Sequence, residues 1–266
     1  MNSLHFTSGT GEHAVVITRV AERLWHALED DRVVGRGYAS PRPDGRIFLG
    51  IDAWQGAAFD RLAEVMLADL PTPLYTVVDE TDLDLTSHWE RAGFTTRRRE
   101  WEYLVPTDPR VTGLGSVLPP SGVTIVAAGE AEEEPLRKVD RAIRDEVEAT
   151  VGWQAMPAEV LVRPDATTLL DPAKYTVAAE SDAYVGLIRV VQVTRQPRIG
   201  LIAVRAGRHR RGIARALLAH VLGSLHRSGI ETASAEVNES NEAALALFEG
   251  VGARRASSNL ELVRRG

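Results

Sequence analysis

The chain has 266 residues, of which 44% are apolar and 26% charged, and it carries a formal net charge of −6 at pH 7. This length suits one large or two small globular domains, and the acidic balance argues against nucleic acid as a partner. The absence of cysteine excludes disulfides, thiolate zinc sites and a cysteine nucleophile. Because no stretch of about eighteen consecutive apolar residues and no apolar N-terminal leader is present, we expect a cytoplasmic protein without a membrane partner.

Short apolar or alternating segments fill the first hundred residues, and turns rich in proline and glycine separate them. The expected elements are, in chain order, strands at 24–28, 33–38 and 47–51, a helix at 57–70, a strand at 74–78, a helix at 83–91 and a strand at 101–105. The longer helix has Leu62, Val65 and Met66 at helical spacing and stops before Pro71. We therefore expect an α/β domain over residues 1–105.

A segment rich in proline and glycine, PTDPRVTGLGSVLPPSG at 106–122, follows this first domain. Its composition is typical of an interdomain linker, which we place at 106–120. The second domain then covers 121–266 and opens with a strand at 123–127 and an amphipathic helix at 130–150.

The second domain contains the most informative stretch of the chain, RIGLIAVRAGRHRRGIARALL at 198–218. An apolar strand at 199–204 leads into a basic turn that ends at Gly212, where a helix begins. A helix N-terminus presents unpaired N–H groups and the positive end of the helix dipole, so it favours a phosphate or pyrophosphate. Arginines at 208, 210, 211 and 215 add positive charge. The stretch contains neither G-x-G-x-x-G nor G-K-S/T, so a dinucleotide fingerprint and a P-loop do not fit.

The two halves of the chain repeat the same order of elements. VVG at 33–35 lies 151 residues before YVG at 184–186, whereas WERAGF at 89–94 lies 159 residues before FEGVGA at 248–253. The first copy has therefore lost eight residues in the interval that holds the basic turn of the second copy. We expect the first copy to lack an anion loop, although a deletion spread over the interval would give the same offsets.

The residues HRRGIA at 209–214, after Val204, resemble the acyl-CoA loop of the GCN5-related N-acetyltransferases (GNATs), whose pattern is Q/R-x-x-G-x-G/A. The first position is histidine instead of glutamine or arginine. A second block, EVNESNEAALALFEGVGA at 236–253, is similar to the family segment N-x-x-A-x-x-L/F-Y/F-x-x-x-G-F/A. Two blocks in the family's order are more specific than one; the alternative is an ordinary βαβ unit with an arginine-rich surface turn.

This resemblance implies an α/β fold of two tandem GNAT-like domains, each a mixed twisted sheet flanked by helices, with a degenerate N-terminal copy. The layout is similar to that of the mycothiol synthases, whose substrate is not carried over because the chain lacks both acid/base positions of that enzyme type. The implied function is transfer of an acetyl group from the co-substrate acetyl-CoA to the primary amine of a small molecule, without a metal. The alternatives are acetylation of a protein amine and CoA binding without catalysis. The protein is expected to be a monomer or a homodimer.

The resemblance also implies where acetyl-CoA binds. The strand at 199–204 splays from the strand at 232–237, which frees backbone groups near Ile202 and Val204 for the pantetheine and the thioester oxygen. The implied contacts come from the end of this strand, the loop, the next helix and the second block: Ile202, Ala203, Val204, His209, Arg210, Arg211, Gly212, Ile213, Ala214, Arg215, Asn241 and Phe248.

The general acid and base are where this chain departs from the family pattern. Phe248 stands where the family commonly carries a tyrosine near the CoA sulfur, and Arg198 stands where some relatives carry a glutamate. The nearest spare carboxylate is Glu236, whose neighbours on the strand at 232–237 suit the packed face, so Glu236 itself points the other way. We expect Glu236 to be the base. The alternatives are a surface carboxylate paired with an arginine, and deprotonation through water.

Overall fold

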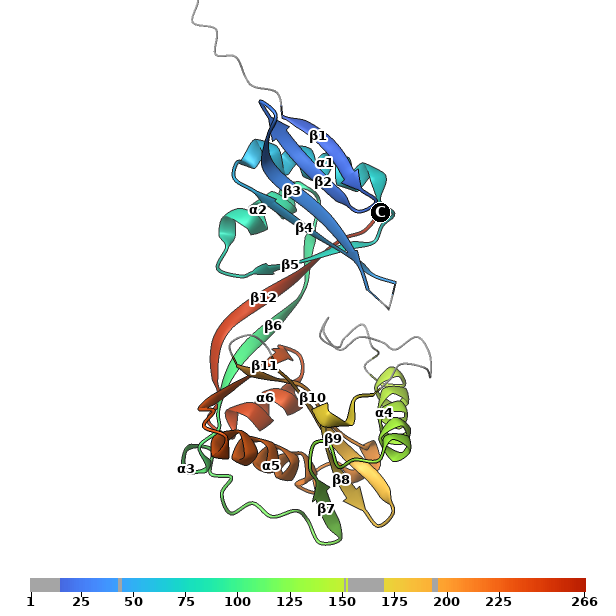
Figure 1. Cartoon of the computed structure of the whole chain (residues 1–266), viewed down its shortest axis with the longest axis vertical. Coiled ribbons are helices and arrows are strands. Elements are labelled where there is room, and N and C mark those ends of the chain that lie inside the picture. The colour runs from blue at the N-terminus through green and yellow to red at the C-terminus, as the bar shows by residue number, and fades with distance from the viewer. Residues whose placement is uncertain (1–14, 43–44, 151, 153–169, 193–195) are drawn as a thin grey trace, which may run out of the picture. The chain divides into compact units, whose positions relative to one another are not determined.

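The computed structural model describes residues 15–42, 45–150, 152, 170–192 and 196–266. The chain divides into two compact units, each of which combines helices with a β-sheet (Figure 1). Unit 1 comprises Met1–Val78, Asp82–Arg97 and Leu262–Gly266, and unit 2 comprises Asp79–Thr81 and Arg98–Glu261. The expected α/β fold class is therefore confirmed.

Unit 1 begins with four antiparallel strands, continues through a helix to a fifth strand, and ends in a short helix. Its elements are β1 (Val16–Ala21), β2 (Leu24–Glu29), β3 (Arg32–Pro41), β4 (Ile47–Ala53), α1 (Gly56–Asp69), β5 (Leu74–Asp79) and α2 (Leu83–Arg91). Strand β5 runs parallel to β4 and pairs with it at two positions, Ile47↔Leu74 and Phe48↔Tyr75. The first strand, β1, is an element that the sequence pattern did not predict.

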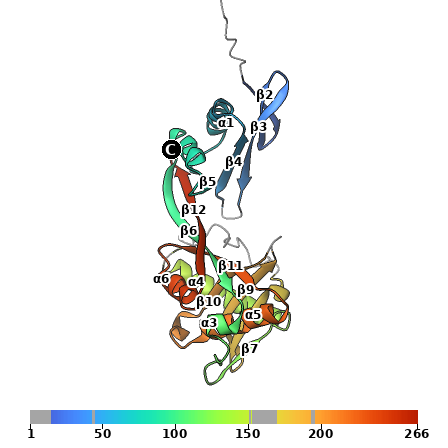
Figure 2. The same ribbon diagram turned by 90° about the vertical axis from the view of Figure 1, so that its left-hand side faces the viewer.

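Helix α1 packs closely on one face of the unit 1 sheet (Figure 2). Its side chains Leu62 and Met66 are fully buried. They lie over Gly35 and Gly37, and a Cβ atom added to Gly37 would lie 2.3 Å from the Met66 sulfur. These glycines thus allow the helix to approach the sheet closely.

Unit 2 is built on a mixed sheet in which neighbouring strands follow the order β12, β6, β11, β10, β9, β8, β7. It contains the larger parts of β6 (Thr95–Pro106) and β12 (Arg254–Arg264). Its other elements are α3 (Pro109–Thr112), β7 (Val123–Val126), α4 (Glu133–Glu148), η2 (Pro172–Lys174), β8 (Tyr175–Glu180), β9 (Ala183–Gln192), β10 (Pro197–Val204), η3 (Ala206–Arg208), α5 (Ile213–Arg227), β11 (Thr232–Asn238) and α6 (Glu242–Glu249). Strands β10 and β11 are parallel, and the other registered pairs are antiparallel.

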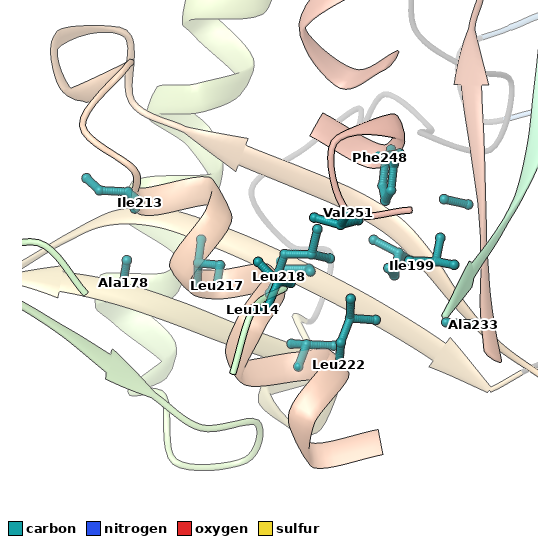
Figure 3. Close-up of a cluster of buried hydrophobic side chains, with 14 of the residues drawn as sticks. Leu114, Ala178, Ile199, Ile213, Leu217, Leu218, Leu222, Ala233, Phe248 and Val251 are labelled. Atoms are coloured by element: carbon teal, nitrogen blue, oxygen red, sulfur yellow. The ribbon is translucent and has the colours of Figure 1, made fainter. Parts of the chain in front are cut away.

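Helices α4 and α5 cover opposite faces of this sheet. Side chains alternate along β10: Ile202 and Val204 pack against the cluster that contains α5, whereas Leu201 and Ala203 pack against the cluster that contains α4. The α5 cluster also includes side chains of α6, and Figure 3 shows part of it. The end of β10 is therefore held from both sides.

Strand β6 explains why the units differ from the expected domains. The sequence places residues 101–105 in the first domain, but β6 pairs with β11 from Pro106↔Thr232 to Glu100↔Asn238. Tyr103 and Val105 are fully buried in the core of unit 2. Unit 1 in turn takes the end of the chain, Leu262–Gly266.

The segment expected to be a linker, 106–120, also packs as part of unit 2. It contains α3, and Leu114 is buried among the side chains of the α5 cluster. The Thr107 hydroxyl donates a hydrogen bond to the Ile230 carbonyl oxygen. Proline and glycine here form turns on the surface of a folded unit, which composition alone does not distinguish from a free linker.

The structure locates the eight residues that the first copy lacks. Two residues separate β4 from α1, whereas eight separate β10 from α5. Six of the missing residues therefore fall in the loop. Helix α1 is one residue shorter than α5, and β5 is one residue shorter than β11.

Within the described residues, none of the helices combines the length and apolar character that a membrane span requires.

The place of β6 in the unit 2 sheet makes a prediction about fragments. A fragment of residues 121–266 lacks β6, so β11 loses its neighbour and the core loses two fully buried side chains. We expect this fragment not to unfold cooperatively on heating, whereas the longer fragment 98–266 should, as followed by circular dichroism. A cooperative transition of 121–266 at the temperature of the longer fragment would contradict the assignment of β6 to unit 2.

Candidate functional site

A cavity of about 1060 Å³ lies within unit 2. Its described walls come from helix α4, the end of β10, the loop at 205–212, the first turn of α5, and the segment from the end of β11 into α6. The basic loop thus borders the same cavity as helix α4, to which the sequence analysis assigned no function.

The parting of β10 and β11 opens one side of this cavity. The two strands are paired only at Arg198↔Ser234 and Ile199↔Ala235, after which β10 continues alongside β9 as far as Val204. The Arg205 N–H donates to the Val185 carbonyl oxygen on the β9 side at 2.9 Å. Because successive residues of a strand direct their backbone groups to alternate edges, those of Ile202 and Val204 point toward β11. The splay that the family resemblance implies is therefore present.

The loop at 205–212 ends in left-handed backbone conformations directly before the first turn of α5. Gly212 is the N-cap of α5 with φ +86°, and Arg210 also has a positive φ of 58°. No atom lies within 4 Å of a Cβ added to Gly212, so the backbone angle, not crowding within the protein, favours glycine. The His209 Nε2–H donates to the Val204 carbonyl oxygen at 2.7 Å. The first N–H groups of α5 have no acceptor within the helix and favour an anion.

The arginines of this loop divide into two groups. Arg208 and Arg211 both pair with Glu180 at the end of β8, the second at 2.9 Å between Nη1 and Oε1. The hydrogen bond from Arg208 is the main reason why the pKa of Glu180 lies below its ordinary value. Arg208, Arg210 and Arg215 line the cavity, whereas Arg211 does not. Only part of the positive charge expected from the sequence therefore faces the candidate anion site.

Glu146, at the end of α4, is a site residue that the sequence analysis missed. Its Oε2 accepts the Ala206 N–H at 2.8 Å and its Oε1 accepts the Arg205 Nε–H at 2.7 Å. Burial raises the pKa of Glu146, but these two donors outweigh it, and the net pKa lies below the ordinary value. The carboxylate is therefore ionised at neutral pH and holds the beginning of the loop.

Two further charged residues of α4, Asp140 and Arg144, line the cavity and were also missed. They form an ion pair at 2.8 Å, with side chains only 8% and 15% exposed. A signal was available in the sequence, because both positions interrupt the apolar stripe that Leu136, Ile143 and Val147 form at helical spacing.

Asn241 has a structural role beside the cavity. It is the N-cap of α6, and its Oδ1 accepts the Ala244 N–H at 3.1 Å. The residues that both were expected in the site and line the cavity are Ile202, Ala203, Val204, His209, Arg210, Gly212, Ile213, Ala214, Arg215 and Asn241. The structure thus brings together all of the predicted contacts except Arg211, Phe248 and Glu236.

Phe248 lies in the core of unit 2, away from the described cavity wall. Its side chain is 3% exposed and stacks on the Tyr103 ring, with 6.1 Å between the ring centroids. Figure 3 shows it among the same buried side chains as Ile199 and Val251. Its neighbours on α6, Ala244 and Leu247, border the cavity instead.

Glu236 lies on the face of β11 opposite the α5 cluster, as the alternation of the strand predicts. Its Oε1 is 3.0 Å from Nη2 of Arg198, and the carboxylate side chain is 14% exposed. Burial raises the pKa of Glu236; the Arg198 charge lowers it, and the charge of Glu102, directly opposite on β6, raises it, so that the net pKa is above its ordinary value. Asn238, two residues further on the same face, lines the cavity. Glu236 therefore lies about 7 Å along the strand from the cavity wall.

Comparisons with known proteins agree with this geometry. Residues 146–263 match the family model of the acetyltransferase (GNAT) domain. A segment of 56 residues is 43% identical to the ribosomal protein bS18 alanine N-acetyltransferase of Escherichia coli strain K12, and it covers 21% of this chain. The match spans only 38% of that curated relative.

Solved structures resemble a larger part of the chain. A GCN5-related N-acetyltransferase from Sphaerobacter thermophilus has a TM-score of 0.63 at 15% identity, covering 93% of this chain and 82% of the other. A tandem GNAT protein from the clavulanic acid biosynthesis pathway has a TM-score of 0.64 at 15% identity, covering 91% of this chain and 82% of the other. These likenesses confirm the tandem GNAT-like fold. The family match covers the loop, the splayed strands β10 and β11 and helices α5 and α6, so this part of the chain is similar to the acetyltransferase (GNAT) domain.

Proposed function

We propose that the chain is an N-acetyltransferase that moves the acetyl group of acetyl-CoA to the primary amine of a small molecule. The observation that carries this proposal is the placement of the loop and the free edge of β10 on one cavity within the GNAT domain. In the proposed reaction the amine nitrogen forms a bond to the acetyl carbon, the carbon–sulfur bond breaks, and the proton lost by the amine is balanced by one that the thiolate gains.

The residues of the cavity fit acetyl-CoA as a co-substrate. The N–H groups at the start of α5, together with Arg210 and Arg215, would hold the pyrophosphate. The backbone of Ile202 and the N–H of Val204, which β11 leaves unpaired, would bind the pantetheine arm and polarise the thioester oxygen. Acetyl-CoA supplies the activated acetyl group, and the protein supplies orientation and fixed dipoles.

Glu236 is our candidate for the base that accepts the proton of the amine. A carboxylate with a raised pKa is a better proton acceptor at neutral pH than an ordinary one. Its pairing with Arg198 also supports the alternative that it is a structural carboxylate. Transfer of the amine proton through water remains the third option.

Unit 1 is proposed to bind no CoA. Its strands β4 and β5 part after two registered pairs, as β10 and β11 do, but only two residues connect β4 to α1. Two residues are too few to form a turn like the one that precedes α5 in unit 2. We therefore expect one acetyl-CoA per chain.

Acetylation of a protein N-terminus is the second candidate function, and the local identity to the ribosomal protein alanine N-acetyltransferase favours it. CoA binding without catalysis is the third, favoured by Phe248 and Arg198 at the usual acid and base positions. Incubation with acetyl-CoA and either a library of small amines or a set of peptides, followed by mass spectrometry, separates the three. Acetylated small amines support the first proposal, acetylated peptides alone support the second, and no product despite CoA binding supports the third.

Gly212→Val should abolish measurable acetyl-CoA binding. A β-branched residue is strained at φ +86°, and its side chain would occupy the space in front of the helix N-terminus. Gly207→Ala is the matched control, because Gly207 lies in the same loop, has no positive φ and has free space around its Cβ position. Titration calorimetry should give one site per chain for the wild type and the control. Undiminished affinity in folded Gly212→Val protein would contradict the loop assignment.

The pH dependence of kcat/KM tests Glu236. A base must be deprotonated, so activity should fall as the pH is lowered through the raised pKa of Glu236. Glu236→Gln should remove this acidic limb and lower the rate by about 10²–10⁴-fold. Arg198→Met should move the limb to higher pH, because the arginine charge lowers that pKa. Wild-type profiles in both variants would show that Glu236 is not the base.

Phe248→Tyr tests whether the missing tyrosine limits the reaction. The ring is 3% exposed and stacked in the core, so the new hydroxyl has to be buried. We expect kcat to rise by less than about tenfold, well below the full effect of a positioned general acid. Phe94→Tyr, which buries a hydroxyl in unit 1, is the control for stability. A hundredfold rise in steady-state kcat would contradict this expectation.

A further inference from the structure

The loop at 205–212 is tied to the rest of unit 2 by two carboxylates from outside it. Glu146 of α4 binds the Ala206 N–H and the Arg205 guanidinium, at 2.8 and 2.7 Å. Glu180 of β8 binds the guanidinium groups of Arg208 and Arg211. We call Glu146 and Glu180 the anchor carboxylates. Together they hold the beginning and the middle of the loop.

Two negative charges beside a candidate pyrophosphate site oppose the binding of an anion if charge alone is considered. The hydrogen bonds of the two carboxylates indicate instead that they hold the loop in place. Each carboxylate accepts two donors from the loop, and these donors are spread over residues 205–211. The side chains of Glu146 and Glu180 are 29% and 19% exposed, so both pairs are partly shielded from solvent.

We propose that Glu146 and Glu180 are positioning residues for the acyl-CoA loop, and that Arg211, which does not line the cavity, acts through Glu180 instead of contacting the co-substrate. This inference rests on the proposed function. The anchor carboxylates fix the loop in the conformation in which the N–H groups at the start of α5 face the cavity. The loop then loses its conformational freedom when the protein folds and not when the pyrophosphate binds. Binding is stronger because it no longer carries this entropic cost.

The backbone of the loop shows why such anchoring matters. Arg210 has φ 58°, a conformation that residues other than glycine seldom adopt. It lies between Arg208 and Arg211, the two residues that Glu180 holds. Without the anchor, the chain around Arg210 is free to relax to commoner angles, which would turn the adjacent N–H groups away from the cavity.

The sign of the change in acetyl-CoA affinity distinguishes positioning from charge. Glu146→Gln and Glu180→Gln each remove a negative charge, so charge alone predicts tighter binding. Positioning predicts a dissociation constant about three- to tenfold higher in each variant, measured by titration calorimetry. In steady-state kinetics the KM for acetyl-CoA should rise while kcat at saturation stays close to the wild-type value.

Two other paired glutamates of unit 2 provide matched controls. Glu133 pairs with Arg137 on α4, and Glu249 pairs with Arg255, and neither lines the cavity. Glu133→Gln and Glu249→Gln remove the same charge and the same kind of ion pair, so they should leave the dissociation constant unchanged. Circular dichroism of all four variants checks that they are folded.

A double-mutant cycle tests the role assigned to Arg211. If Arg211 acts through Glu180, then Arg211→Met should weaken binding in the wild type but add little in the Glu180→Gln background. If Arg211 contacts the pyrophosphate, the loss should be the same in both backgrounds, which would overturn the inference. Equal or tighter binding by folded Glu146→Gln and Glu180→Gln proteins would overturn it too. A wild-type protein that does not bind acetyl-CoA would instead overturn the proposed function.

Discussion

The candidate site depends on the early parting of two parallel strands. Strands β10 and β11 are paired at only two positions, and beyond Ile199 none of the described residues forms a strand along the edge of β10 that faces β11. Unpaired backbone groups are costly when buried, so an edge of this kind is stable beside a cavity or a ligand. The side chains at the end of β10 alternate between the two faces of the sheet, so they pack against the α4 cluster on one face and the α5 cluster on the other. The opening thus lies in a stretch of strand that is packed on both faces.

The two units show what the loop adds to this shared geometry. Strands β4 and β5 of unit 1 part in the same way after two registered pairs. Unit 1 follows β4 almost directly with α1, whereas unit 2 inserts the loop that brings the N-terminus of α5 to the open edge. The free edge suits a neutral, extended ligand arm, and the loop adds a place for negative charge. Among the residues that the structure describes, only unit 2 combines the two.

Much of the fold and part of the site could be predicted because they depend on local pattern. The loop, the helix after it and the internal repeat are contiguous in the chain, and the alternation of β11 was enough to place Glu236 on the correct face. The anchor carboxylates were not predicted, because Glu146 and Ala206 are 60 residues apart and Glu180 and Arg211 are 31 apart. The assignment of β6 to unit 2 likewise depends on tertiary pairing with β11. Composition misled at 106–120, where turns rich in proline and glycine resemble a linker.

We propose that backbone N–H groups of unit 2 hold acetyl-CoA, and amide hydrogen exchange observes those groups directly. With saturating acetyl-CoA, mass spectrometry of proteolytic peptides should show slower exchange in 200–216, because the edge of β10 and the start of α5 acquire acceptors. Peptides that cover 50–60 of unit 1 should exchange as in the free protein. Unchanged exchange in 200–216, or protection at 50–60 instead, would contradict the account.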